Sequence, residues 1–114
     1  MNDETLKAEY SFARAQNREA AGEQFHEAER IAKAHGLLLT RHTGTHYSLT
    51  KRNDFREIVW RLNIYPGNRR LWWDRNHGKP PFYLPFNLGQ PWTLLDVVRA
   101  AVEAQEERER TATA

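Results

Sequence analysis

The chain of 114 residues carries 17 Lys and Arg residues against 15 Asp and Glu residues, and it contains no cysteine. This length is typical of one domain with a single small core. The lack of cysteine excludes disulfide bonds, thiolate metal sites and a cysteine nucleophile, and it favours a reducing, cytoplasmic location. No apolar run approaches the roughly 20 residues of a membrane span, so no membrane association is expected.

The basic residues are concentrated in the middle of the chain. Residues 41–79 hold nine basic and three acidic residues, whereas the segments on either side each hold two more acidic than basic residues. Six aromatic residues lie in the same middle segment: Tyr47, Phe55, Trp60, Tyr65, Trp72 and Trp73. Arginines and aromatic rings in one segment favour nucleic-acid binding, because cations bind phosphates and rings stack on bases. The same residue types are also enriched at the energetic centres of protein interfaces.

Residues 3–35 predict a long helix, because they contain no proline and are rich in alanine, glutamate and arginine. Gly22 lowers the helix propensity and follows a polar stretch, so one bent helix and two shorter helices are both consistent with the pattern. Gly36 is suited to end the helix in a left-handed conformation. The apolar residues that recur at helical spacing predict the buried stripe: Ala21, Phe25, Ala28 and Ala32.

The next part of the chain predicts an antiparallel sheet of three to four strands, separated by short turn sequences. The expected strands are residues 37–41, 45–50, 57–65 and 69–74. The third strand alternates most clearly, and it places one apolar set on a single face: Ile58, Trp60, Leu62 and Ile64.

Parity fixes the last hairpin. A loop of four residues places Leu71 and Trp73 on the same face as Leu62, whereas an odd loop would bury Arg70 at high cost. With four loop residues, Arg61 lies opposite Asp74. The other face of the sheet then carries Arg61, Asn63, Tyr65, Arg70 and Trp72.

Two interpretations of this second face stay open. Either a helix or the following loop covers Tyr65 and Trp72, or these rings form an exposed patch that binds a partner. The candidate residues for binding nucleic acid or a protein partner are Arg41, Arg61, Tyr65, Arg69, Arg70, Trp72 and Arg75.

Residues 75–91 contain four prolines and two glycines, which predict an irregular crossover held against the sheet by Phe82, Leu84 and Phe86. Thr93 begins a second helix, with Asp96 placed as its capping-box partner. Together these elements predict the α+β class, with a long N-terminal helix, an antiparallel sheet, a proline-rich crossover and a C-terminal helix. We expect one domain over residues 1–105 and a polar tail, residues 106–114, that frays into solvent.

No metal or cofactor is expected from the sequence. The five histidines show no HExxH spacing, and His42 and His46 have no paired carboxylate nearby in the chain. Glycine-rich phosphate loops and the GxSxG pattern are also absent from the sequence.

Residues 34–47 resemble the start of the HicA toxin family. Gly36, Arg41, Gly44 and His46 stand at the family's spacing, and Thr45 takes the place of the family's serine. The resemblance implies a fold like that of double-stranded RNA-binding domains, in which a helix, an antiparallel sheet and a second helix follow one another. It also implies that His46 is the catalytic residue of a metal-free ribonuclease.

Three functional hypotheses follow. The first is a small non-enzymatic module whose basic, aromatic sheet face binds nucleic acid or a nucleic-acid-handling protein, as an accessory or inhibitor protein of a phage or mobile element would. The second is a HicA-like endoribonuclease that uses His46. The third is a structural protein that forms a homodimer through its N-terminal helix.

Overall fold

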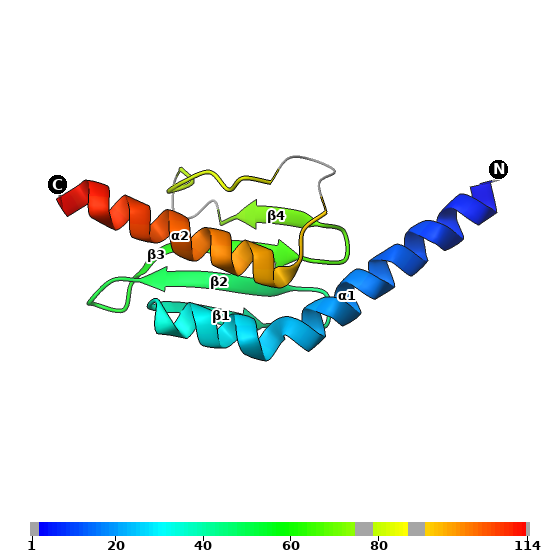
Figure 1. Ribbon diagram of the computed structural model, residues 1–114, viewed down its shortest axis with the longest axis horizontal. Coiled ribbons are helices and arrows are strands. Elements are labelled where there is room, and N and C mark those ends of the chain that lie inside the picture. Colours follow the sequence, from blue (N-terminus) through cyan, green and yellow to red (C-terminus); the bar gives the residue numbers. More distant parts are fainter. Residues whose placement is uncertain (1–2, 75–78, 87–90, 114) are drawn as a thin grey trace.

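The computed structural model of the chain describes residues 3–74, 79–86 and 91–113, and it has the predicted α+β architecture (Figure 1). The elements follow in the order α1 (Asp3–Ala34), β1 (Leu37–Arg41), β2 (Tyr47–Arg52), β3 (Ile58–Tyr65), β4 (Arg70–Trp73) and α2 (Leu94–Thr113). The four strands form one antiparallel sheet in the order β1-β2-β3-β4. Consecutive strands are therefore neighbours throughout the sheet.

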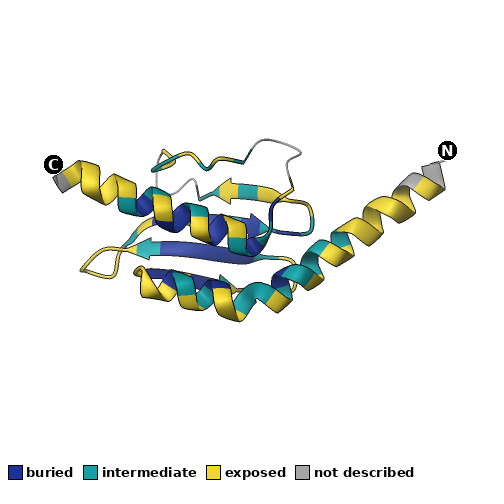
Figure 2. Cartoon of the chain, viewed as in Figure 1, coloured by how far each residue is buried: buried dark blue, intermediate teal, exposed yellow. Residues whose placement is uncertain are grey.

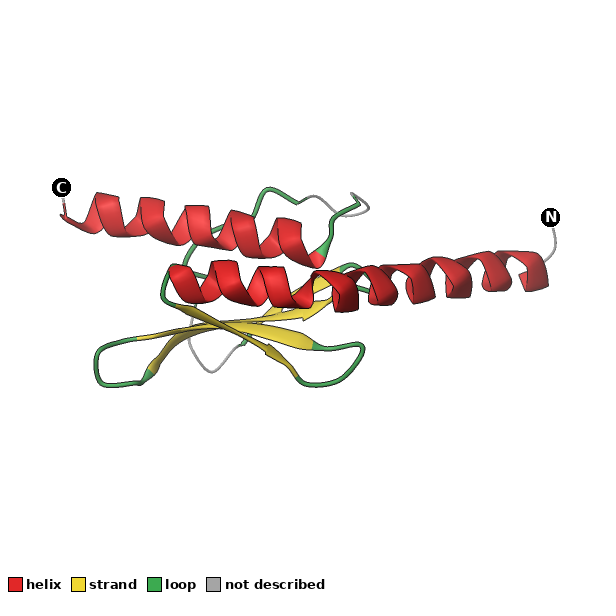
Figure 3. Ribbon diagram, turned by 60° about the horizontal axis from the view of Figure 1, so that its bottom comes forward, coloured by secondary structure: helices red, strands yellow, loops and turns green. Residues whose placement is uncertain are grey.

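Both helices lie on the same side of the sheet (Figure 3). The core fills the space between the two helices and the sheet. It is built from alternate strand residues, the apolar stripe of α1 and the inner face of α2. Its buried members from these elements are Ala21, Ala28, Ala32, Leu37, Leu39, Tyr47, Leu49, Trp60, Leu62, Ile64, Leu94, Val97, Val98, Ala101 and Val102. The indole Nε1 of Trp60 donates a hydrogen bond to Oε1 of Gln105 at 2.9 Å, so this buried tryptophan has its polar atom satisfied.

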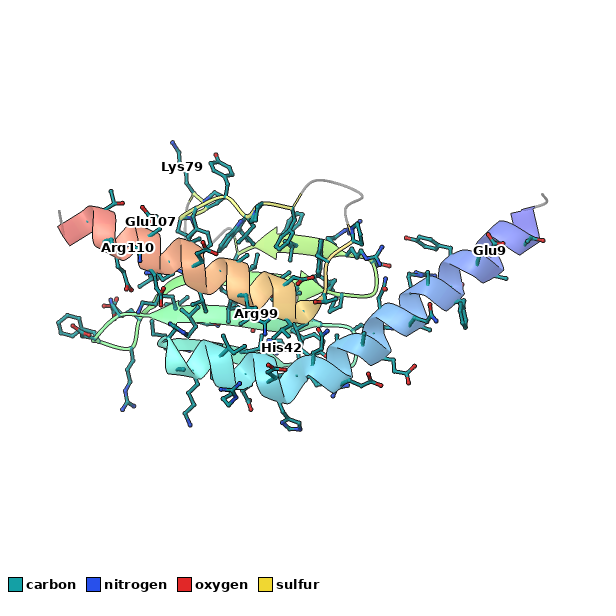
Figure 4. The ribbon with its side chains drawn as sticks, in the orientation of Figure 1. Glu9, His42, Lys79, Arg99, Glu107 and Arg110 are labelled. Carbon is teal, nitrogen blue, oxygen red and sulfur yellow. The ribbon has the colours of Figure 1, made fainter. Side chains whose placement is uncertain are left out.

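Helix α1 is continuous and bent, and Figure 1 shows it changing direction about midway. Its C-terminal half packs on the core, whereas its N-terminal half projects past the sheet with mostly exposed side chains (Figure 2). Tyr10 and Phe12 are 59% and 65% exposed, and Glu9 also lies at the surface (Figure 4). The helix ends as predicted at Gly36, whose φ of 75° lies in the left-handed region that glycine adopts without strain.

The β3–β4 hairpin has the predicted register. Tyr65 pairs with Arg70 and Leu62 pairs with Trp73, so four residues form the loop. The backbone N–H of Asp74 donates to the Arg61 carbonyl at 3.0 Å, and the two side chains approach to 3.6 Å. Leu71 and Trp73 are partly buried against the core, as parity requires.

The second helix and residues 79–86 of the crossover follow the sequence prediction, whereas residues 75–78 and 87–90 of the predicted crossover lie outside the described residues. Phe82, Leu84 and Phe86 pack partly buried against the core. The capping box is formed, because the Thr93 N–H donates to Oδ2 of Asp96 at 2.9 Å and the Asp96 N–H donates to Oγ1 of Thr93 at 3.3 Å.

The end of α2 differs from the prediction of a frayed tail. The helix continues to Thr113. Glu107 and Arg110 form an ion pair one turn apart near its end (Figure 4), and Gln105 donates to Oε1 of Glu109 at 3.0 Å. Lys51 on β2 lies 3.7 Å from the Glu109 carboxylate, which ties the helix to the sheet. Pairs at i,i+3 and i,i+4 and this contact stabilise a segment whose polar composition alone suggests a tail.

Candidate functional site

The face of the sheet turned away from both helices, here named the open face, carries the candidate site (Figure 3). It carries the residues that alternate with the core positions, and no described helix covers it. Its exposure lies toward β4, because Ser48 and Thr50 on β2 are buried, at 2% and 4% exposed, whereas Trp72 is 47% exposed. The register places Ser48, Asn63 and Trp72 in one row across β2, β3 and β4. Tyr65 and Arg70 form the next row, at the end of the sheet where the β1–β2 turn begins.

Three rings stack at that end of the open face. The ring centroids of His42 and His46 are 4.5 Å apart, and those of His46 and Tyr65 are 4.7 Å apart with an interplanar angle of 7°. The turn that brings the two histidines together is held by its backbone, because the His42 and Thr43 N–H groups both donate to the His46 carbonyl. The β1–β2 turn and the end of β3 therefore share one continuous aromatic row.

The hydrogen bonds of Asn63 define the tautomer of His46. The Asn63 amide nitrogen donates to the Trp72 carbonyl at 3.3 Å, so its Oδ1, 2.8 Å from His46 Nε2, is the acceptor. Nε2 of His46 therefore carries a hydrogen and donates this bond. This link from β4 through β3 to the turn also fixes the orientation of the His46 ring.

His42 is held by Ser48, whose Oγ lies 2.7 Å from His42 Nε2. Partial desolvation lowers the pKa of His42 below its usual value, and the positive charges of His46 and Arg61 lower it further. The neutral form of His42 is thus favoured at neutral pH. A neutral ring suits this stack, because two adjacent imidazolium rings would repel each other.

The cationic and exposed part of the open face lies beside the ring stack. Arg61 is half-buried, with Nη1 3.6 Å from Oδ2 of Asp74, and its buried Nε has no hydrogen-bond partner among the described residues. Arg70 is exposed, and Trp72 is 47% exposed. A shallow pocket of about 380 Å³ is lined by Tyr65, Asn68, Arg70 and Trp72.

The structure brings together five of the eight residues singled out from the sequence: His46, Arg61, Tyr65, Arg70 and Trp72. The sequence left open whether Tyr65 and Trp72 are covered or exposed. Within the described part of the chain Trp72 is exposed, whereas the His46 ring covers part of Tyr65. These residues come from β3, β4 and the β1–β2 turn.

Arg41 and Arg69, two of the candidate binding residues, lie outside the open face. Arg41 has the same strand parity as the buried residue Leu39, so it faces the helices, with its Cζ 5.7 Å from the centroid of the Tyr47 ring. Arg69 lies in the β3–β4 turn with a φ of 51° and donates from Nη2 to Oδ1 of Asn17 on α1 at 3.3 Å. Arg75 lies outside the described residues.

Three members of the site were not singled out from the sequence as functional: His42, Ser48 and Asn63. The β1–β2 hairpin was the available signal for His42. Because Arg41 pairs with Tyr47, the flanking residues His42 and His46 lie side by side across the turn.

Within the described residues, no group of three or more His, Cys, Asp or Glu side chains is arranged to hold a metal ion. No helix in the described part of the chain is long and apolar enough to cross a membrane. The chain matches no protein family, no curated protein and no solved structure.

Proposed function

We propose that the open face binds single-stranded nucleic acid, with RNA as the first ligand to test. The observation that carries this proposal is the stack of His42, His46 and Tyr65 beside Arg70 and Trp72, on a face that no described helix covers. The cytoplasmic location predicted from the absence of cysteine suits this role.

The chemistry of the open face matches unpaired bases. Every base has a π-face, so exposed rings such as Trp72 bind bases with little sequence preference, and a duplex keeps those faces stacked internally. Arg70 supplies an exposed guanidinium for a phosphate oxygen. Because Arg61 is already paired with Asp74, the electrostatic contribution is small and stacking dominates.

Fluorescence anisotropy with a labelled single-stranded RNA and the matching duplex tests this proposal. We expect the single strand to bind more tightly, with a salt slope of only about one unit, since single strands contribute about 0.7 unit for each phosphate contact. Trp72→Ala should weaken binding about thirtyfold, the middle of the range for loss of one stacked base.

Phe12→Ala is the matched control, because Phe12 is an exposed aromatic residue on the projecting half of α1. It should leave the affinity unchanged. No binding by the wild-type protein at low salt, or equal affinities of the wild-type and Trp72→Ala proteins, would remove the proposal.

Cleavage of the bound RNA is a second candidate function, and the fixed tautomer of His46 favours it. Its Nδ1 would accept the proton of a ribose 2′-hydroxyl while the 2′-oxygen attacks the adjacent phosphorus. The bond to the 5′-oxygen then breaks, this oxygen takes up a proton, and a 2′,3′-cyclic phosphate remains.

Incubation with RNA in a chelator, followed by mass spectrometry, tests cleavage separately from binding. A cyclic phosphate product that disappears in His46→Asn supports this candidate. Intact RNA, or cleavage that survives the substitution, rejects it and leaves the binding proposal in place.

The third candidate is a homodimer that pairs through α1. The exposed side chains of Tyr10 and Phe12 favour it. Light scattering distinguishes it directly. A mass of one 13.4 kDa chain at high concentration rejects the dimer.

A further inference from the structure

The loop between β2 and β3, residues 53–57, presents one aromatic side chain to solvent. Phe55 is 83% exposed, and among the exposed large hydrophobic residues of the described chain only Tyr83 is more exposed. A lone exposed aromatic residue is ordinary on a protein surface. The way the backbone holds Phe55 distinguishes it.

Asn53 organises this loop. Its side-chain Oδ1 accepts hydrogen bonds from the N–H groups of Phe55 and Glu57, both at 2.9 Å. Its backbone N–H donates to the Glu57 carbonyl at 2.9 Å, and its carbonyl accepts from the Arg56 N–H at 3.0 Å. Its amide nitrogen also donates to Oε1 of Glu57 at 3.3 Å. Five hydrogen bonds of one residue therefore brace the loop that exposes Phe55.

Arg56 adopts a left-handed conformation, with a φ of 63°. A non-glycine residue pays a conformational cost of about 1 kcal/mol there. The Arg56 carbonyl accepts a hydrogen bond from Nη1 of Arg52 at 2.7 Å, which holds this conformation. Arg52 at the end of β2 and Arg56 in the loop are both exposed, and so are Asp54 and Glu57.

The loop and the ring stack lie at opposite ends of the same strand. β3 runs from Ile58, next to the loop, to Tyr65 in the stack. Its eight residues span about 23 Å at about 3.3 Å per residue. The open face between the two ends presents Val59, Arg61 and Asn63, and the loop curves away from the helices toward this side (Figure 3).

We propose that Phe55 is a second base-stacking platform of the same nucleic-acid site. One strand lies along β3, with bases on Tyr65 and Trp72 at one end and a base on Phe55 at the other. This inference rests on the proposed function of the open face. The flexible backbone of a single strand can follow this path, and the length of β3 sets the shortest oligonucleotide that reaches both ends.

A length series of fluorescein-labelled oligouridylates of 3 to 12 nucleotides tests this arrangement by anisotropy. Single-stranded nucleic-acid sites cover roughly 4–16 nucleotides, so the series spans both regimes. The wild-type affinity should rise in a step at the length that reaches both platforms. Phe55→Ala should remove the step, weakening the longest oligomers about tenfold and the shortest less than about twofold. Phe55→Trp should keep the step.

Tyr83→Ala is the control, because Tyr83 is 93% exposed on the crossover and is not part of either platform. It should change no affinity in the series, whereas Trp72→Ala should weaken binding at every length.

Each other outcome overturns the inference in a recognisable way. If Phe55→Ala binds every length as the wild type does, Phe55 is no platform and the function of the open face stands. If it weakens all lengths equally, Phe55 does not act at a separate end of the strand. If the wild-type protein binds no oligomer, the proposed function fails together with this inference.

Discussion

The two faces of the sheet are formed by alternate residues of the same strands, and they differ in almost every property. Toward the helices, Trp60, Leu62 and Ile64 are at most 2% exposed and pack into the core. On the open face, the intervening residues of β3 are Arg61 and Asn63, which form polar contacts with β4 and the β1–β2 turn. One face forms the core, and the other carries the proposed binding site. Substitutions on the two faces should therefore separate stability from affinity.

The largest effect is expected from Trp60→Ala on the covered face. Trp60 makes edge-to-face contacts with Trp73 and Phe82, at centroid distances of 5.6 Å and 5.4 Å. Its removal should lower the free energy of unfolding by about 3–5 kcal/mol, because the substitution leaves a cavity in the core. Urea denaturation followed by circular dichroism measures this loss. A loss below about 1 kcal/mol would show that this face does not hold the fold together.

Gln105→Leu should have the next largest effect, about 1–3 kcal/mol, because it leaves the buried indole N–H of Trp60 without its acceptor. The same denaturation assay applies. The control is Trp60→Phe combined with Gln105→Leu, in which donor and acceptor are both removed. The double variant should lose less than the sum of the two single losses, and strict additivity would contradict a role for this hydrogen bond.

Arg70→Gln on the open face should change the free energy of unfolding by less than about 0.5 kcal/mol, because Arg70 is exposed. It should reduce the salt slope of RNA binding by about 0.7 unit, the contribution of one phosphate contact. Anisotropy titrations at several salt concentrations give the slope. Arg30→Gln, on the exposed side of α1, is the matched control and should leave the slope unchanged. Equal slopes for the wild-type and Arg70→Gln proteins would remove Arg70 from the site.

The smallest effect concerns the protonation of His42. Its pKa is lowered in the folded state, whereas the unfolded chain has the ordinary value of about 6.5. Between these two pKa values the unfolded chain binds more protons than the folded protein, so the free energy of unfolding rises with pH. The stabilisation by neutral His42 is therefore complete above about pH 6.5 and is lost as the pH falls toward the folded pKa. NMR titration of the His42 ring measures its pKa. The groups that face it are His46, Arg61 and Ser48, and a raised value would contradict this arrangement.

The sheet was predictable because its register depends on local alternation. The apolar pattern of β3 and the cost of burying Arg70 were enough to define the β3–β4 hairpin and the membership of Arg61, Tyr65 and Trp72 in the open face. Arg41 shares the parity of Leu39, so it lies on the side of the sheet that faces the helices. The direction of the Arg69 side chain could not be predicted, because it depends on a positive φ at this turn residue and on a contact with Asn17 of α1.

The parts that the sequence did not predict depend on contacts between distant residues. The His42–His46–Tyr65 stack joins a turn to a strand that follows it by about twenty positions, and Asn63 connects the stack to β4. The continuation of α2 to Thr113 depends in part on Lys51 of β2. Local composition carries no direct record of such contacts.

The most direct test of a binding open face is an NMR titration of the 15N-labelled protein with single-stranded RNA, observed at the tryptophan indole N–H groups. The signal of Trp72 on the open face should shift progressively, while that of Trp60, which is bonded to Gln105 in the core, should stay in place. A stationary Trp72 signal under conditions where RNA is bound, or equal shifts at Trp72 and Trp60, would contradict binding on the open face.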